Sequence, residues 1–175
     1  MNWSLILARQ NLKQVPDYVF RRTNLRDLQL TGNALTKIPK DIARLEQLNV
    51  LKLDENQLDG LPTELALLNC LQILDVSANQ ILDLDDQFVL PRNLLEARFS
   101  NNKIRQLPHF FFIMSNFLQV LDLSVNELSC FLLARGKSCR ICSKTSPSML
   151  IILICTRSLV GVVYRLGKRC SVLCL

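Results

Sequence analysis

The stretch LRDLQLTGNALTKIP (Leu25–Pro39) returns as LNVLKLDENQLDGLP (Leu48–Pro62), and this recurrence decides the fold. The frame of leucines recurs further along the chain, and one asparagine holds the same place in each copy: Asn33, Asn56, Asn79, Asn102 and Asn126. These asparagines are 23, 23, 23 and 24 residues apart. Such a period indicates units that cannot bury their apolar faces alone and must stack on their neighbours. The sequence therefore predicts a solenoid.

The further copies of the frame are LQILDVSANQILDL (71–84), LLEARFSNNKIRQLP (94–108) and LQVLDLSVNELSCF (118–131). A partial first unit, WSLILARQNLKQVP (3–16), has Gln10 where the asparagine belongs. Three departures loosen the frame without breaking its register: Asp85 replaces a proline, Ala97 replaces a leucine, and one residue is added between 108 and 118. We predict an array of about six units over residues 1–131.

The asparagines are interpreted as structural residues. Alternating apolar residues such as Leu51 and Leu53 predict a short strand with one buried face, after which the chain must turn. A buried Asn offers two N–H donors and an oxygen acceptor, so a stacked column can satisfy the backbone groups that the turns leave unpaired. Asn33, Asn56, Asn79, Asn102 and Asn126 are therefore predicted to form a ladder that stabilises the array.

The second half of each unit carries apolar residues at helical intervals, as in Ile42, Ala43 and Leu45. This pattern predicts short helical or 3₁₀ turns on the side opposite the strands. Phe88, Phe111 and Met114 occupy equivalent places and are predicted to be core residues. The run 110–112 of phenylalanines is accordingly interpreted as core filling and not as a ligand pocket.

At these residues the chain resembles the leucine-rich repeat family, whose consensus is LxxLxLxxNxLxxLP followed by a variable half. The unit length and the Leu-Pro ending are most similar to intracellular members of the Ras-group, scribble and erbin types, which are adaptors and scaffolds. The resemblance implies an α/β solenoid with short parallel strands on a concave face and short helical or 3₁₀ turns on a convex face. It also implies protein–protein interaction as an intracellular scaffold or adaptor in signalling.

The strands of such a solenoid present their outward side chains in columns on the concave face. The central column is predicted to be Ile6, Gln29, Lys52, Asp75, Arg98 and Asp122. One neighbouring column holds Asp27, Val50, Ile73, Glu96 and Val120, and the other holds Thr31, Asp54, Ser77, Ser100 and Ser124.

Two interpretations of the central column stay open together. Opposite charges that face each other on adjacent strands can satisfy one another, at about 0.2 to 1 kcal/mol per pair. Exposed charges with apolar neighbours can also form the centre of a partner-binding surface, in which Lys52 and Arg98 matter more for binding than for folding. The candidate partner-binding residues are Asp27, Gln29, Val50, Lys52, Asp54, Ile73, Asp75, Glu96, Arg98, Val120 and Asp122.

Charge and cysteine content both change near the end of the array. Residues 1–127 hold 13 basic and 15 acidic residues, whereas 128–175 hold eight basic residues and no acidic one. Six of the seven cysteines also lie beyond residue 128. No cysteine precedes Leu25, and the apolar run Leu5–Ala8 is shorter than that of a signal peptide. The sequence therefore predicts a reducing, cytoplasmic location.

Residues 132–175 form a basic, Cys-rich, partly apolar tail that is predicted to be irregular, and three interpretations of it stay open. One is a splice or gene-model product, in which case the chain is a truncated isoform without independent function. Another is an interfacial membrane segment in the apolar run Met149–Val163, which would make the chain a membrane-associated structural protein with peripheral membrane contact. The run is too short to span a bilayer, which takes about 20 residues. The third is a zinc site formed by Cys139, Cys142, Cys170 and Cys174.

Enzyme chemistry finds little support in the sequence. The single histidine, His109, has no assignable catalytic partner, and the five glycines form no phosphate-binding loop. The basic tail has no interleaved aromatic residue besides Tyr164, so nucleic-acid binding is not expected. We predict a non-catalytic chain that needs no cofactor and binds a protein partner.

Overall fold

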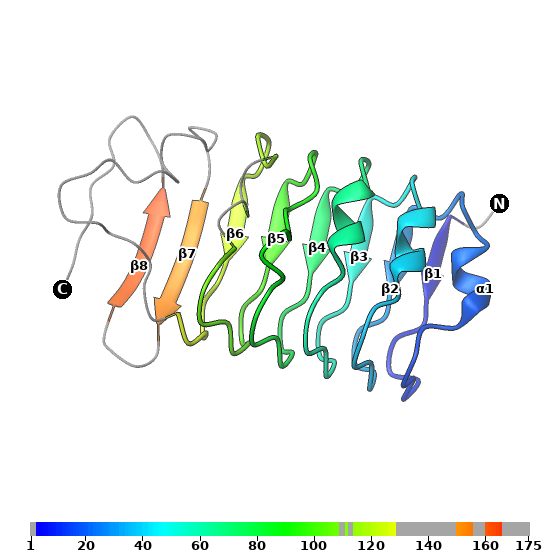
Figure 1. Cartoon of the computed structure of the whole chain (residues 1–175), viewed down its shortest axis with the longest axis horizontal. Helices are drawn as coiled ribbons and strands as arrows, with labels where there is room; N and C mark the ends of the chain where they lie inside the picture. The colour runs from blue at the N-terminus through cyan, green and yellow to red at the C-terminus, as the bar shows by residue number, and fades with distance from the viewer. Residues whose placement is uncertain (1–2, 109–110, 112–113, 129–149, 156–159, 166–175) are drawn as a thin grey trace.

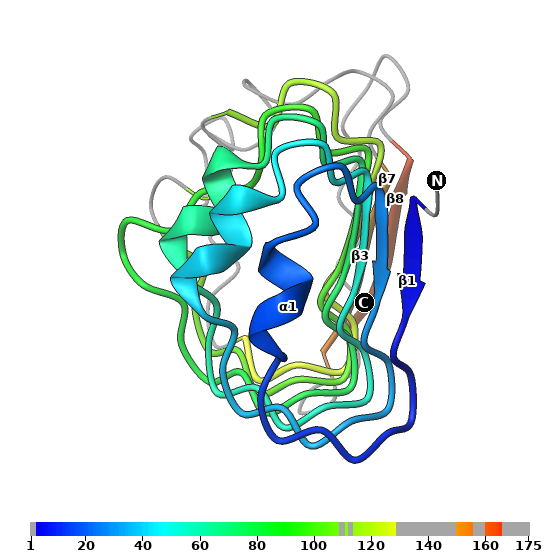
Figure 2. The same cartoon turned by 90° about the vertical axis from the view of Figure 1, so that its right-hand side faces the viewer.

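The computed structural model describes residues 3–108, 111, 114–128, 150–155 and 160–165. Eight strands form one sheet in which each strand pairs with the next along the chain (Figure 1). The first six are parallel and three residues long, and the chain coils once between each and the next (Figure 2). They are β1 (Ser4–Ile6), β2 (Asp27–Gln29), β3 (Val50–Lys52), β4 (Ile73–Asp75), β5 (Glu96–Arg98) and β6 (Val120–Asp122). The predicted solenoid is confirmed.

Short helical turns lie across the coil from the sheet (Figure 2). They are α1 (Asp17–Phe20) and the two 3₁₀ turns η1 (Lys40–Arg44) and η2 (Thr63–Leu67). A proline stands directly before each of them, as Pro16, Pro39 and Pro62. The pyrrolidine ring holds φ near the helical value and needs no N–H partner at a helix start, which is why the helical turns begin there.

The unit with Asp85 in place of this proline keeps the first backbone hydrogen bond of the turn but does not continue into a helix. The Asp85 carboxylate accepts the N–H of Gln87 at 2.8 Å, and the Asp85 carbonyl accepts the N–H of Phe88 at 2.8 Å. Residues 86–90 are described, and they contain no helix. The register from β4 to β5 continues unbroken, so this departure changes the turn and not the stacking.

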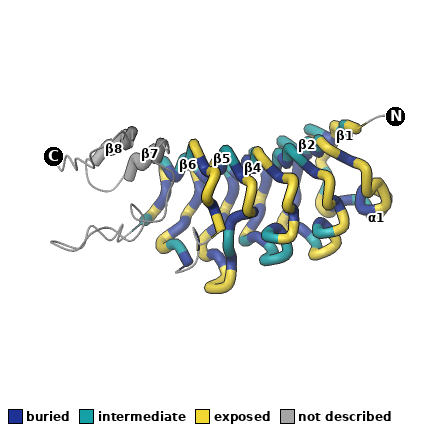
Figure 3. The backbone as a smooth tube through the Cα atoms, turned by 90° about the horizontal axis from the view of Figure 1, so that it is seen from above, coloured by how far each residue is buried: buried dark blue, intermediate teal, exposed yellow. Residues whose placement is uncertain are grey.

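An apolar core runs along the inside of the coil, and buried and exposed residues alternate regularly along each turn (Figure 3). Near β5 the core is aromatic: Phe88, Phe99 and Phe111 are fully buried, and the Phe111 ring centroid lies 6.0 Å from that of Phe88 and 5.7 Å from that of Phe99. The prediction for Phe88 and Phe111 is confirmed.

The core prediction for Met114 is wrong, because this side chain is 46% exposed. The added residue of this unit lies in the same segment and shifts Met114 out of the periodic frame. The N–H of Asn116 donates to the Met114 carbonyl at 3.0 Å, so Met114 belongs to a tight turn. Phe110 and Phe112 lie outside the described residues.

The five asparagines hydrogen-bond to the backbone in one repeated pattern. Asn56 is typical: its side-chain nitrogen donates to the carbonyls of Leu53 and Leu30, each at 3.0 Å, and its side-chain oxygen accepts the N–H of Leu35 at 3.1 Å. The first acceptor is in the same unit and the other two groups are in the preceding unit. Each asparagine thus joins two consecutive turns of the solenoid, in the manner expected of a structural ladder.

The residue before each ladder position has left-handed backbone geometry. The six residues are Arg9, Gly32, Glu55, Ala78, Asn101 and Val125, with φ between 52° and 70°. This conformation is unfavourable for side chains with a Cβ, and most of all for β-branched ones. Val125 is therefore a strained residue in an otherwise regular turn.

Val125→Asn is expected to raise the free energy of unfolding by about 0.5 to 1 kcal/mol, because Asn tolerates the left-handed region better than Val does. The Val125 side chain is 43% exposed, so little packing is lost. The reverse exchange, Asn101→Val, should lower stability by a similar amount, since Asn101 has the same φ of 53°. Urea unfolding of both variants measures this, and two unchanged midpoints would mean that the turn stores no strain.

Two further strands continue the sheet beyond β6. β7 (Leu150–Cys155) runs parallel to β6, with Leu121 opposite Ile151, and β8 (Val160–Arg165) pairs antiparallel with β7. The prediction of an irregular tail is thus wrong for these two segments. Both are rich in β-branched and aliphatic residues, which favour strands wherever an unpaired sheet edge is available. They also include most of the apolar run that suggested an interfacial membrane segment.

Candidate protein-binding surface

The register of the sheet brings the predicted columns together on its outward side, which we call the strand face. Gln29 lies opposite Lys52, Lys52 opposite Asp75, Asp75 opposite Arg98, and Arg98 opposite Asp122. The neighbouring column is equally continuous and consists of Asp27, Val50, Ile73, Glu96 and Val120. Every predicted strand-face residue within β2 to β6 therefore has its predicted neighbour.

The strand face mixes apolar and charged side chains at different depths. Val50, Ile73 and Val120 are half-buried, while Ile6 in β1 is 62% exposed. Asp75 is buried, with only 8% of its surface exposed. The middle of the face therefore contains partly exposed apolar side chains. Beside them lie charged side chains that contacts within the array hold in place.

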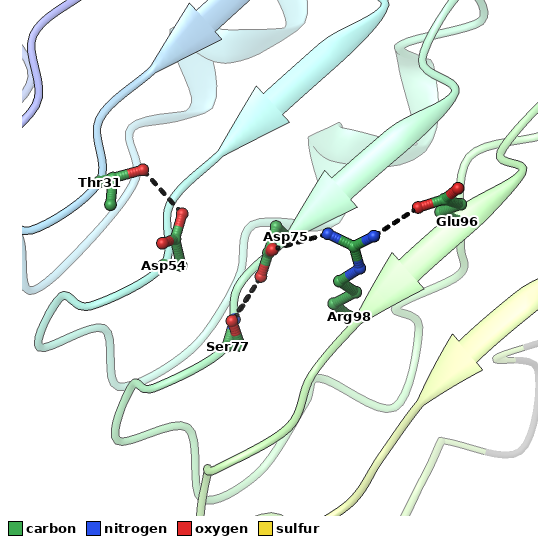
Figure 4. Close-up of polar contacts among 6 residues, drawn as sticks. All are labelled: Thr31, Asp54, Asp75, Ser77, Glu96 and Arg98. Atoms are coloured by element: carbon green, nitrogen blue, oxygen red, sulfur yellow. Dashed lines mark hydrogen bonds and ion pairs between the residues drawn. The ribbon is translucent and has the colours of Figure 1, made fainter. Parts of the chain in front are cut away.

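Arg98 is paired within the array. Its guanidinium lies 3.5 Å from the Asp75 carboxylate on β4 and 2.8 Å from the Glu96 carboxylate on its own strand (Figure 4). The interpretation that opposite charges satisfy one another across the strands thus describes Arg98 and Asp75.

The same interpretation does not describe Lys52. Lys52 lies opposite Asp75 in the register, yet no ion pair in the described part of the chain includes it. The Asp75 carboxylate is already occupied by Arg98 and by the hydroxyl of Ser77, which donates to it at 2.6 Å. The arrangement leaves the Lys52 ammonium without a carboxylate partner among the described residues.

The other strand-face carboxylates are held by local donors. The Thr31 hydroxyl donates to Asp54 at 2.8 Å (Figure 4), and the Ser124 N–H donates to Asp122 at 2.9 Å. Asp27 accepts from the Ser4 hydroxyl at 3.2 Å and from the Gln29 amide at 3.1 Å. These bonds fix where the carboxylates lie, so a partner would meet a largely preorganised polar surface.

Across the coil, ion pairs join consecutive units. Lys40 on η1 lies 3.0 Å from the Glu64 carboxylate on η2. The hydrogen bond from Lys40 holds the pKa of Glu64 below its usual value. This pair lies away from the strand face, so we assign it to the stacking of consecutive units and not to partner binding.

Comparison with known proteins finds a family whose repeats resemble the first part of the array. A leucine-rich repeat family model matches residues 4–58 and 23–81. The array has the fold of a leucine-rich-repeat-like solenoid, and residues 4–81 are similar in sequence to that family. Leucine-rich repeat domains are generally protein-binding modules and typically non-catalytic. A comparison with curated protein sequences finds no match.

Solved structures with similar leucine-rich repeats include a plant protein. It is the ectodomain of the membrane receptor kinase GASSHO1/SCHENGEN3 from Arabidopsis thaliana, in complex with Casparian strip integrity factor 2. The similarity has a TM-score of 0.56 and 25% sequence identity, and it covers 66% of this chain. The chain spans only 17% of that ectodomain.

Several predicted sites of other kinds fall outside the described leucine-rich repeats. The candidate zinc ligands Cys139, Cys142, Cys170 and Cys174 are among them, as is His109. Among the described residues, no group of three or more His, Cys, Asp or Glu side chains could hold a metal ion. In the same part of the chain, no helix has the length and apolar character needed to cross a membrane.

Proposed function

We propose that the leucine-rich repeat array binds a partner protein on its strand face, and that the chain acts as an intracellular scaffold or adaptor in signalling. The general role of such domains supports the first part. The similar plant ectodomain was crystallised with a bound partner, which supports it further. The intracellular location rests on the sequence, and Cys70, the one cysteine within the described repeats, is exposed and free.

One observation carries the proposal: Lys52 lies in the middle of the strand face as a cation with no acidic partner in the part of the chain that the structure describes. Val50 precedes it by two residues on the same strand, and Ile73 lies opposite Val50, so apolar side chains flank the ammonium. Binding surfaces combine an apolar centre with a few specific polar contacts. This arrangement fits a partner that places an acidic group at Lys52 and apolar groups against Val50 and Ile73.

Arg98 has a different role from Lys52. Its ion pairs with Asp75 and Glu96 hold those two carboxylates in place, so Arg98 positions part of the surface. Arg98→Glu would put three carboxylates together and disturb the array itself. Lys52 is therefore the cleaner site for a binding experiment.

Lys52→Glu in the full-length chain is expected to abolish capture of the specific partner from cell extract while leaving folding intact. The reason is that the substitution places a carboxylate where the partner's acidic group would lie, next to Asp75, at little cost to the core. Capture is compared by mass spectrometry between the wild type and the variant, and circular dichroism checks the fold.

Lys103→Glu is the matched control, because it makes the same charge change at an exposed residue outside the strand columns. Partners retained by wild type and Lys103→Glu but lost from Lys52→Glu would support the strand face as the binding site. The same partners on both variants would show that binding occurs elsewhere.

A further inference from the structure

A second charged surface lies at the N-terminal end of the array, formed by β1, α1 and the chain between α1 and β2. Both elements face the viewer when the array is seen from this end (Figure 2). We call this surface the N-terminal patch, and its residues are Trp3, Tyr18, Arg21, Arg22 and Arg26. All five are exposed, with Trp3 at 42% and Tyr18 at 46%.

The arginines of the patch are held against its aromatic rings. The Arg26 guanidinium lies 4.8 Å from the centroid of the Trp3 ring, and that of Arg22 lies 5.8 Å from the Tyr18 ring. The backbone supports the first contact, because the Arg26 N–H donates to the Trp3 carbonyl at 2.8 Å. A guanidinium stacked on a ring keeps the N–H groups of its edge available for a ligand.

Charge is distributed unevenly along the array, and the patch lies in its basic part. Residues 1–49 hold eight basic and four acidic residues, whereas 50–127 hold five basic and 11 acidic ones. None of the ion pairs among the described residues includes Arg21, Arg22 or Arg26. By contrast Arg44, one repeat after Arg21, pairs with Asp41 at 3.2 Å. Arg22 and Arg26, which lie against the two rings, therefore have no acidic partner among the described residues.

We infer that the N-terminal patch binds an acidic segment of a protein. Guanidinium groups bind carboxylates with paired hydrogen bonds, and Trp, Tyr and Arg are the residue types enriched at the energetic centres of protein interfaces. Stacking also restrains the arginines before binding, which lowers the entropy lost on association. This surface is separate from the strand face, so the inference does not depend on the function proposed above.

A lipid surface fits the patch less well. Membrane-surface helices insert an apolar face, and α1 has only four residues. Its apolar residues Val19 and Phe20 are buried in the array, at 0% and 4% exposure, and so cannot enter a bilayer. The exposed residues of the patch are arginines and two aromatic rings, each covered by an arginine, so the patch presents no apolar face to a bilayer.

The test uses Trp3, which is the single tryptophan of the chain and therefore reports directly on the patch. Full-length protein is titrated with a short Glu-rich peptide that contains no tryptophan, and Trp3 emission and the anisotropy of the labelled peptide are recorded. We expect a saturable change in both signals that weakens as salt is added. A Lys-rich peptide of equal length should give none.

Arg22→Gln with Arg26→Gln should weaken binding of the Glu-rich peptide by roughly tenfold or more. The matched control is Arg92→Gln with Lys103→Gln, which removes the same charge at exposed residues far along the array and should leave the affinity unchanged. Circular dichroism establishes that both variants fold, and affinities are taken from titration midpoints because losing Arg26 alters Trp3 emission itself.

Three results would overturn the inference. The first is no saturable signal with the Glu-rich peptide. The second is equal weakening in the two double variants, which would indicate a response to net charge. The third is a Trp3 response to vesicles of anionic phospholipid, or to single-stranded RNA, without a response to the peptide, which would assign the patch to that ligand class instead.

Discussion

Phe99→Ala is expected to lower the free energy of unfolding by about 3 to 5 kcal/mol. Phe99 is fully buried on the inner side of the sheet, and its ring meets that of Phe111 edge to face at 5.7 Å. Removing the ring leaves a cavity that neighbouring units close only by giving up their own stacking. The edge-to-face contact adds about 0.5 to 1.5 kcal/mol to what burial contributes.

The aromatic cluster has a reason in the sequence. Ala97, two residues earlier, is fully buried where the equivalent residues Leu51 and Leu74 are larger. Large aromatic rings nearby can take up the volume that the smaller side chain leaves. Protein interiors are packed to crystal-like density, so the rings are expected to fill nearly all of the space that Ala97 leaves.

Phe117→Ala is the matched control for Phe99→Ala, because it deletes the same ring from a side chain that is 56% exposed. It should change the free energy of unfolding by no more than about 0.5 kcal/mol. Chemical unfolding monitored by circular dichroism compares the two. Similar losses in both variants would mean that the Phe99 ring is not packed as described, and would reopen the interpretation of the phenylalanine segment as a ligand pocket.

Asn56→Ala is expected to lower the free energy of unfolding by about 2 to 3 kcal/mol. The Leu35 N–H is buried and has the Asn56 side-chain oxygen as its acceptor at 3.1 Å. Without that oxygen the N–H has no partner, which costs about 1 to 3 kcal/mol for a buried donor. The space left by the amide adds to the loss.

The three carbonyls that Asn56 contacts, those of Leu30, Leu53 and Asp54, lose less. The Leu30 carbonyl also accepts from Asn33 at 2.8 Å, and the Leu53 carbonyl also accepts from Asn79 at 3.0 Å. Both keep one donor in the variant. The Asp54 carbonyl also keeps a donor, the Gly32 N–H at 2.9 Å. The orphaned N–H therefore accounts for most of the expected effect, although four backbone groups are involved.

Gln10→Ala tests the ladder from the other side, because Gln10 holds the ladder position in the first unit but is exposed. Its contact with the ladder runs through its own backbone N–H, which donates to Asn33 at 3.0 Å and remains in the variant. We expect less than about 0.5 kcal/mol of change. If thermal unfolding of Asn56→Ala were as unaffected as that of Gln10→Ala, the ladder would not be structural.

The binding predictions and the stability predictions for Phe99 and Asn56 address separate sets of residues. Phe99 and Asn56 lie inside the coil, whereas Lys52 and the N-terminal patch lie on its surface. A variant at Phe99 or Asn56 should lose both stability and binding, whereas a variant at Lys52 or in the N-terminal patch should lose binding alone. Two binding surfaces on one rigid array would suit a scaffold, which must hold more than one protein.

The sequence by itself determined the period, the strands, the ladder and the order of side chains in each strand-face column. It could do so because a stacked repeat places residue i beside residue i+23, so that a regular pattern dictates backbone position. The register from β1 to β5 follows this rule, and across the insertion before β6 it becomes i+24 with the same columns preserved.

Only the tertiary structure decided which charges meet. Lys52 and Arg98 look alike in the sequence, but Arg98 reaches two carboxylates and Lys52 none among the described residues. The repeat places Arg26 one unit after Trp3, but the stacking of the guanidinium on the ring depends on both rotamers. The pairing of β7 with β6 depends on an open sheet edge. A repeat fixes where each Cα lies, whereas side-chain contacts depend on rotamers and on the competition of several donors for one acceptor.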